Sequence, residues 1–242
     1  RWSASVMNET KYNQLISDKR NLMGPNVIRM LNEITSRVPL ANGMRVLDLG
    51  CGTGLSSIYL AHQYDIQVYA TDLWISATEN YRRIRNVEAE DQIIPIHADA
   101  NCLPYADEFF DAVVSMDAYH YFGRERGFFS QKLLPLLKPG GIFLFGVPGF
   151  KWELHDNPPK ELLLSWGDED LTTMHSCAWW HNLLTEEGGI NNLSIFELDC
   201  FEQAWGDWLN CDNTYAVTDR AAMNAGAGQY MNLIGITGQK AR

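Results

Sequence analysis

The sequence has few of the features that mark membrane or nucleic-acid-binding proteins. Its 242 residues contain no run of about 18 apolar residues, which a membrane-spanning helix needs, so we expect no integral membrane contact. Basic residues are also sparse: 19 Lys and Arg stand against 30 Asp and Glu, and the formal net charge is -11. Because nucleic acids bind basic surfaces, this balance predicts no nucleic-acid partner.

Cysteine is equally scarce, with five residues at positions 51, 102, 177, 200 and 211. Their odd number and unpaired spacing argue against a disulfide framework, and we expect a reduced, cytoplasmic protein. The N-terminus shows no signal-peptide pattern. Because the chain begins without methionine, residues 1–6 are predicted to be an expression remnant, with Met7 as the native start.

Motifs of several enzyme classes are missing. The sequence has no G-x-S-x-G elbow, no phosphate loop with lysine and no H-E-x-x-H helix. His175, Cys177 and His181 lie close in sequence, but their spacing is not a strong zinc pattern and a fourth ligand is not evident. We therefore predict no metal site.

The strongest positive signal is the stretch from Met44 to Gly54. Its apolar run, Val46–Leu49, predicts a buried parallel strand, followed by a glycine-rich turn and a helix. Glycines let the backbone turn sharply and let a ligand lie directly on it, while the helix start supplies N–H donors. The spacing is G-x-G-x-G rather than the dinucleotide G-x-G-x-x-G. Asp48, two residues before Gly50, is a poor neighbour for a pyrophosphate and a good one for a cation.

Acidic residues follow the next two predicted strands. The second strand, residues 66–71, ends at Asp72, which lies 22 positions after Gly50. An acid at this spacing is placed to accept both hydroxyls of a ribose. The third strand, residues 93–97, runs into Asp99. An aspartate at this place either contacts a ligand or simply forms a turn.

Three segments together resemble class I S-adenosylmethionine-dependent methyltransferases of the small-molecule type, similar to methyltransferase domains 11 and 25. They are Val46–Gly54 (motif I), Phe110–Met116 (motif II) and the Leu-Lys-Pro-Gly-Gly of residues 137–141. The resemblance implies that the glycine turn holds the amino-acid end of the cofactor, that Asp48 serves its ammonium group and that Asp99 takes the adenine amino group. The expected cofactor-binding residues are Asp48, Gly50, Cys51, Gly52, Thr53, Gly54, Asp72, Leu73, Trp74, Asp99, Ala100, Met116 and Tyr121.

The expected fold is α/β: a Rossmann-like three-layer sandwich around a mostly parallel seven-stranded sheet with the last strand antiparallel. One domain, residues 7–242, is expected, with N-terminal cap helices in residues 7–38 and a cofactor-binding core in residues 44–148. Two insertions, residues 149–175 and 199–229, are expected to cap the substrate. The remaining predicted elements are a helix at 127–137, strands at 142–147, 193–198 and 230–237, and a helix at 176–187.

Catalytic candidates follow the fourth strand, whose carboxyl end is where ligands bind in open α/β sheets. Asp117, Tyr119 and His120 are the candidates, and they lie in the hexapeptide of residues 117–122 that follows this strand. His120 is the candidate base because an unperturbed histidine titrates near working pH. The alternative is that this histidine, between two tyrosines, is structural.

The function predicted from the resemblance is methyl transfer from S-adenosyl-L-methionine to a small-molecule acceptor, an amine or another N, O or S nucleophile. Two alternatives stay open: lipid modification similar to cyclopropane fatty acid synthases, and a non-catalytic S-adenosylmethionine-binding protein. Six of the eight tryptophans fall between residues 152 and 208, where they either form an aromatic lid or pack the insertions onto the sheet. The sequence leaves monomer and homodimer equally open.

Overall fold

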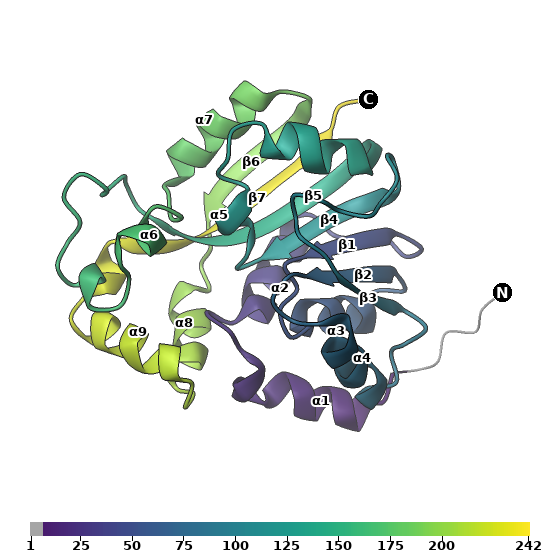
Figure 1. Ribbon diagram of the computed structural model, residues 1–242, viewed down its shortest axis with the longest axis horizontal. Helices are drawn as coiled ribbons and strands as arrows, with labels where there is room; N and C mark the ends of the chain where they lie inside the picture. The colour runs from purple at the N-terminus through teal and green to yellow at the C-terminus, as the bar shows by residue number, and fades with distance from the viewer. Residues whose placement is uncertain (1–6) are drawn as a thin grey trace.

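The sheet organises the chain, for which a computed structural model describes residues 7–242 (Figure 1). The prediction of an expression remnant at residues 1–6 lies outside the described residues. In this range the sheet has seven strands in the order β3-β2-β1-β4-β5-β7-β6. They are β1 (Arg45–Leu49), β2 (Gln67–Asp72), β3 (Ile93–His97), β4 (Phe110–Met116), β5 (Leu137–Phe150), β6 (Ile190–Glu197) and β7 (Met231–Lys240).

The strand directions confirm the predicted fold class. The pairs β1–β2, β2–β3, β1–β4 and β4–β5 are parallel, while β7 is antiparallel to both β5 and β6. After β1 the chain builds β2 and β3 on one side and then crosses to build β4 on the other. The carboxyl ends of β1 and β4 therefore form the topological switch point, the place where such sheets bind ligands.

Helices cover both faces of the sheet and make three layers (Figure 1). Alternate strand residues point to opposite faces, so Val46 enters one buried cluster and Leu47 the other. The first cluster includes residues of α2, α3 and α4, and the second includes Trp180 of α7. The helices are α1 (Glu9–Ser17), α2 (Val27–Arg37), α3 (Leu55–Gln63), α4 (Ala77–Asn86), α5 (Tyr119–Phe122), α6 (Asp168–Leu171), α7 (Cys177–Glu187), α8 (Phe201–Leu209) and α9 (Thr214–Asn224).

Some predicted boundaries were wrong. Residues 127–137 do not form one regular helix: a π-helical turn at Phe129–Leu133 passes into a 3₁₀ turn at Leu134–Leu136. Pro135 has no N–H to donate and disfavours a continued α-helix. The fifth strand begins at Leu137, five residues earlier than predicted, and β6 begins at Ile190.

The two insertions contact each other. The Ser165 hydroxyl donates a hydrogen bond to Asp219, and the Trp166 and Trp205 rings meet edge to face at 5.9 Å. The Trp208 indole N–H donates to the second oxygen of Asp219 at 2.8 Å. Several of the tryptophans thus pack the insertions together. Across residues 7–242 the helices are too short or too polar for any of them to span a bilayer.

Candidate functional site

A cavity of about 280 Å³ opens at the switch point between β1 and β4. Its walls come from the glycine turn after β1, the segments that follow β2, β3 and β4, and a segment that runs into the first residue of α2. We call this segment, residues 21–27, the roof segment. Twelve of the predicted site residues line it: Gly50, Cys51, Gly52, Thr53, Asp72, Leu73, Trp74, Asp99, Ala100, Met116, Asp117 and Tyr121.

The glycine turn has the backbone that its spacing predicts. Gly50, Gly52 and Gly54 have φ of 72°, 53° and 82°, in the left-handed region that side chains disfavour. Gly50 also lies against α5, because a Cβ on it would stand 2.3 Å from the Cβ of Ala118. The turn is therefore fitted closely to the segment that follows β4.

Asp72 ties the end of β2 to this turn. One carboxylate oxygen accepts the Gly52 N–H at 2.8 Å, and the other accepts the N–H groups of Trp74 and Ile75, each at 2.8 Å. A carboxylate offers about four lone-pair directions, so the fixed group retains capacity to accept from a ligand in the cavity.

Asp48 is buried beneath the turn and does not line the cavity. The hydroxyls of Ser56 and Ser57 both donate to its Oδ2 at 2.6 Å. Its Oδ1 is buried without a hydrogen-bond partner among residues 7–242. Burial raises the pKa of Asp48 to about 6, although the two serine hydrogen bonds oppose the rise. This carboxylate is thus a negative charge held at a cost, with one oxygen unsatisfied.

Apolar side chains gather at the mouth of the cavity. Trp74 is 68% exposed and Tyr121 is 46% exposed, and their rings meet at 5.5 Å. Leu73 and Met23 are exposed beside them on the same cavity. Exposed apolar groups that converge on one opening are typical of ligand-binding sites.

Asp117 is an acidic group on the cavity wall with an unusual backbone conformation. Its φ of 55° is in the left-handed region. A Cβ added to Gly24 of the roof segment would stand only 2.2 Å from its Oδ2, so the two residues are packed closely. Burial, and then the charge of Asp219, raise the pKa of Asp117 well above its ordinary value. The carboxylates of Asp117, Asp170 and Asp219 also raise the pKa of Tyr121, after burial. Asp170 and Asp219, one from each insertion, thus act electrostatically on this part of the cavity, although neither side chain lines it.

Four predicted site residues lie outside the cavity lining: Asp48, Gly54, Tyr119 and His120. Tyr119 is buried in the second core cluster, where its ring stacks on Phe145 at 4.0 Å. His120 is only 2% exposed, and burial, with a smaller effect of Arg124, lowers its pKa to about 3. A histidine with so low a pKa is a weak base, and this one lies outside the cavity lining, so the role of His120 as the base stays a prediction that the geometry does not favour.

The roof segment is the part of the site that sequence reasoning largely missed. The Thr53 hydroxyl donates to the Asn21 carbonyl at 2.8 Å, and a Cβ on Gly52 would stand 2.8 Å from the Met23 sulfur. Asn26 anchors the segment to α8, donating from its N–H to the Ala204 carbonyl and from its side chain to Asp207. The sequence predicts the helix start at Gly24-Pro25, and the predicted cap of residues 7–38 makes Met23 a candidate ligand contact, with packing on the domain as the alternative. Met23 does line the cavity.

Comparison with known proteins identifies the core of this site. Residues 47–145 match the model of a family described as a methyltransferase domain. A dimethylglycine N-methyltransferase of Parasynechococcus marenigrum is 42% identical over 113 residues, 46% of this chain and 39% of that protein. A fatty-acid O-methyltransferase of Mycolicibacterium smegmatis is 34% identical over 128 residues, 50% of this chain and 45% of that protein. The chain matches less than half the length of these curated relatives.

Solved structures share the fold over most of the chain. Phosphoethanolamine N-methyltransferase 2 of Haemonchus contortus, solved with S-adenosyl-L-methionine, has a TM-score of 0.73 and 17% identity; the match covers 96% of this chain and 56% of that one. The [4+2]-cyclase SpnF has a TM-score of 0.70 and 18% identity, with 96% and 92% covered. At such identities the likeness establishes the architecture, and the chemistry has to be argued from the site.

Proposed function

We propose, from the premise that residues 47–145 belong to the methyltransferase domain family, that the chain binds S-adenosyl-L-methionine and methylates a small amine. The product of the cofactor is then S-adenosyl-L-homocysteine. The observation that carries the choice of an amine is Asp117, a carboxylate on the cavity wall that accepts no hydrogen bond from residues 7–242.

The residues of the cavity fit the cofactor. The left-handed glycines carry no side chains, so a ligand can lie directly on the turn, although their own N–H groups donate within the chain. The unsatisfied charge of Asp48 beneath the turn favours an ammonium group above it. Asp72 is fixed at the rim, where a ribose hydroxyl can donate to it. Trp74 offers a ring face to the adenine, and Asp99, exposed after β3, offers an acceptor for its amino group.

The bound cofactor supplies a sulfonium methyl group, which is electrophilic without help from the protein. The chain has to hold the acceptor in line and remove a proton from it, because an ammonium has no lone pair. Asp117 serves both needs in this proposal: a bound ammonium favours its charged form, and burial makes that carboxylate a stronger base than an ordinary aspartate. Asp117 would then hold the proton that the ammonium releases, which leaves the amine nitrogen with a free lone pair.

The insertions 149–175 and 199–229 serve as the substrate cap in this proposal. Asp170 belongs to the first and Asp219 to the second, and their charges act on Tyr121 and Asp117 as described above. A cationic acceptor gains from this concentration of negative charge, whereas a carboxylate or phosphate acceptor is repelled. The substrate under this cap is thus proposed to be a small cationic molecule.

The test is methyl transfer from isotope-labelled S-adenosyl-L-methionine to small amines, each paired with the alcohol and the thiol of the same skeleton. Mass spectrometry should find methylated amines at rates well above the paired compounds. Asp117→Asn, which keeps the shape and tolerates the left-handed backbone, should lower kcat by roughly 10²–10⁴ while changing cofactor affinity little. Asp91→Asn, at an exposed turn, is the matched control and should act like the wild type.

Each contrary result has a distinct meaning. Equal transfer to alcohols, or full activity of Asp117→Asn, contradicts the amine proposal. Transfer to unsaturated lipids alone supports the lipid-modification alternative. Tight cofactor binding with no transfer to any acceptor class supports the non-catalytic alternative.

A further inference from the structure

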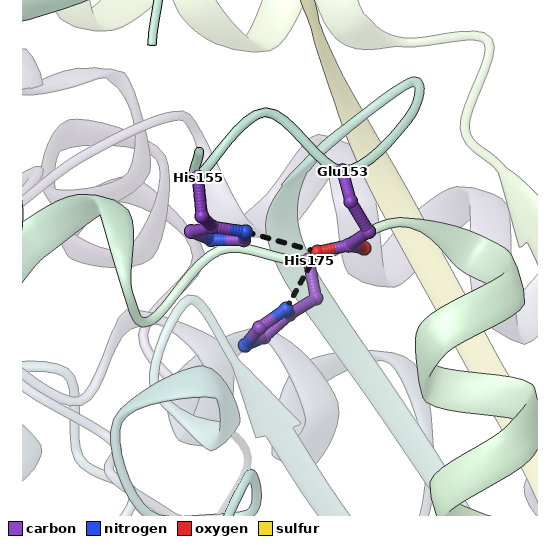
Figure 2. Close-up of side chains that lie close together, drawn as sticks. All are labelled: Glu153, His155 and His175. Carbon is purple, nitrogen blue, oxygen red and sulfur yellow. Dashed lines mark hydrogen bonds and ion pairs between the residues drawn. The ribbon is translucent and has the colours of Figure 1, made fainter. Parts of the chain in front are cut away.

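We propose that Glu153, His155 and His175 form a binding site for one zinc ion, separate from the cofactor cavity. Glu153 and His155 follow β5 at the start of the first insertion, and His175 lies at its end, before α7 (Figure 2). One ligand atom from each side chain lies within 4.8 Å of the others. None of the three residues lines the cofactor cavity.

The distances suit a tetrahedral metal. The Nδ1 atoms of His155 and His175 lie 3.1 Å and 3.0 Å from the same oxygen, Oε2 of Glu153, as the dashed lines of Figure 2 show. Zinc bonds of about 2.0–2.1 Å at tetrahedral angles place neighbouring ligand atoms roughly 3.3 Å apart. The two nitrogen–oxygen distances are within a few tenths of an ångström of this spacing, and the two nitrogens lie within 4.8 Å of each other.

The hydrogen bonds of His155 point the same way. Its Nε2 lies 3.0 Å from the Leu171 carbonyl and 3.1 Å from the Met174 carbonyl. A carbonyl only accepts, so Nε2 carries the ring proton and the Nδ1 of the neutral ring has a lone pair. Because that nitrogen faces a carboxylate oxygen, either a second ring proton or a bound cation has to lie between them. A histidine that donates one nitrogen to a backbone carbonyl and presents the other to a carboxylate has the arrangement of metal ligands.

The surroundings hold the other two ligands in place. The Ser176 N–H donates to Oε1 of Glu153 at 2.7 Å, which leaves Oε2 directed at the histidines. The His175 ring stacks on Trp179 with centroids 3.6 Å apart. The side chains of Glu153, His155 and His175 are 40%, 27% and 13% exposed, so water can reach the fourth position. Two imidazoles and a carboxylate favour zinc over magnesium or calcium, which prefer oxygen ligands.

The consequence is mechanical. A zinc ion here would join the two ends of the first insertion, because it links residues just after β5 to the residue just before the cap of α7. The insertion carries Asp170, whose negative charge contributes to the raised pKa of Tyr121 at the cavity. The ion would thus stiffen one wall of the proposed substrate cap without touching the reacting atoms.

The sequence prediction of no metal site considered a different set. It weighed His175 with Cys177 and His181, whereas the structure brings His175 to Glu153 and His155, about 20 positions earlier. His181 is exposed on α7 and belongs to no such group among residues 7–242. It therefore supplies a matched control histidine.

The test uses untagged protein stripped with a chelator and titrated with zinc by calorimetry, with metal content measured after dialysis. We expect one zinc per chain and a higher melting temperature with zinc. Glu153→Gln, which can still accept from Ser176, and His175→Gln should each weaken zinc binding at least 10- to 100-fold, whereas His181→Gln should not. Cobalt substitution should give the visible bands of a tetrahedral site in the wild type but not in Glu153→Gln or His175→Gln.

Some results would overturn the proposal. They are the absence of stoichiometric zinc binding to the wild type, or binding that survives in both ligand variants. Circular dichroism in the absence of metal shows whether those variants remain folded. If His175→Gln unfolds, the comparison of Glu153→Gln with His181→Gln decides the matter. Equal affinity for magnesium would also contradict it, because the nitrogen ligands would then have no role.

Discussion

Replacing Asp48 by Asn tests whether the fold holds a charge beneath the glycine turn for a cationic ligand. The pKa of Asp48 is raised to about 6, chiefly by burial, against roughly 3.9 for an aspartate in an unfolded chain. Between these values the folded state binds more protons than the unfolded state, so this residue makes the free energy of unfolding fall as pH rises. Above the folded pKa the whole cost of burying the charge is present.

The magnitude follows from the two pKa values. From pH 4.5 to pH 7.5 the contribution of Asp48 to the free energy of unfolding should fall by about 2 kcal/mol. Asparagine does not titrate, so the stability of Asp48→Asn relative to the wild type should rise by about 2 kcal/mol over the same range. The variant also loses or strains the bonds from Ser56 and Ser57, but that change is the same at every pH.

The assay is urea unfolding of the ligand-free protein, followed by tryptophan fluorescence at several pH values. Saturating S-adenosyl-L-methionine should shrink the pH-dependent difference, because a nearby ammonium favours the charged form of Asp48 and lowers its pKa. The variant should also bind the cofactor roughly tenfold more weakly, equivalent to about 1.4 kcal/mol. Parallel stability curves for the two ligand-free proteins would refute the reasoning, since they would mean that Asp48 does not titrate in this window.

Three further substitutions test the cavity. Asp72→Asn should weaken cofactor binding by roughly 1.5–3 kcal/mol, measured by calorimetry, because a neutral amide accepts from ribose hydroxyls less strongly; an unchanged Kd removes the ribose role. Gly50→Ala combines a left-handed φ with a clash against Ala118, whereas Gly43→Ala has a φ of 81° and open space, so chemical unfolding should show a clearly larger loss for Gly50→Ala. Trp74→Ala should leave stability within about 0.5 kcal/mol, because the ring is exposed, yet lower cofactor affinity by roughly 0.5–1.5 kcal/mol; equal affinity would separate Trp74 from the adenine.

The parts of the fold that the sequence predicted well are those with local signals. The strands at Ile93–His97 and Phe110–Met116 have the predicted bounds, because each is a short apolar run closed by turn residues. The edge strand β6 was placed three residues late. Its first part, Ile190 to Asn192, is polar at two of three positions and has a register irregularity against β7, so it lacks the pattern of a buried strand.

The site residues that could be predicted are likewise those with a local sequence signal. The glycine turn and Asp72 could be predicted because their spacing along a βαβ unit follows from the fold itself. The contact between Gly24 and Asp117 joins residues 93 positions apart, and neither residue carries a pattern that announces the other. The sequence also did not show which side chains of α5 face the cavity. This helix turns Tyr121 toward the cavity and Tyr119 into the core, which a hexapeptide of polar and aromatic residues does not disclose.

The left-handed backbone at Asp117 restricts which amino acids this position can accept. Asparagine, aspartate and glycine tolerate such a φ far better than other residues, and of these only aspartate can take up a proton. Replacement by glutamate is disfavoured here for two reasons. Glutamate tolerates the left-handed φ less well, and its longer side chain would clash with the roof segment at Gly24. Variants selected for a new acceptor should therefore keep Asp117 and change its neighbours, so that specificity evolves around a fixed acid.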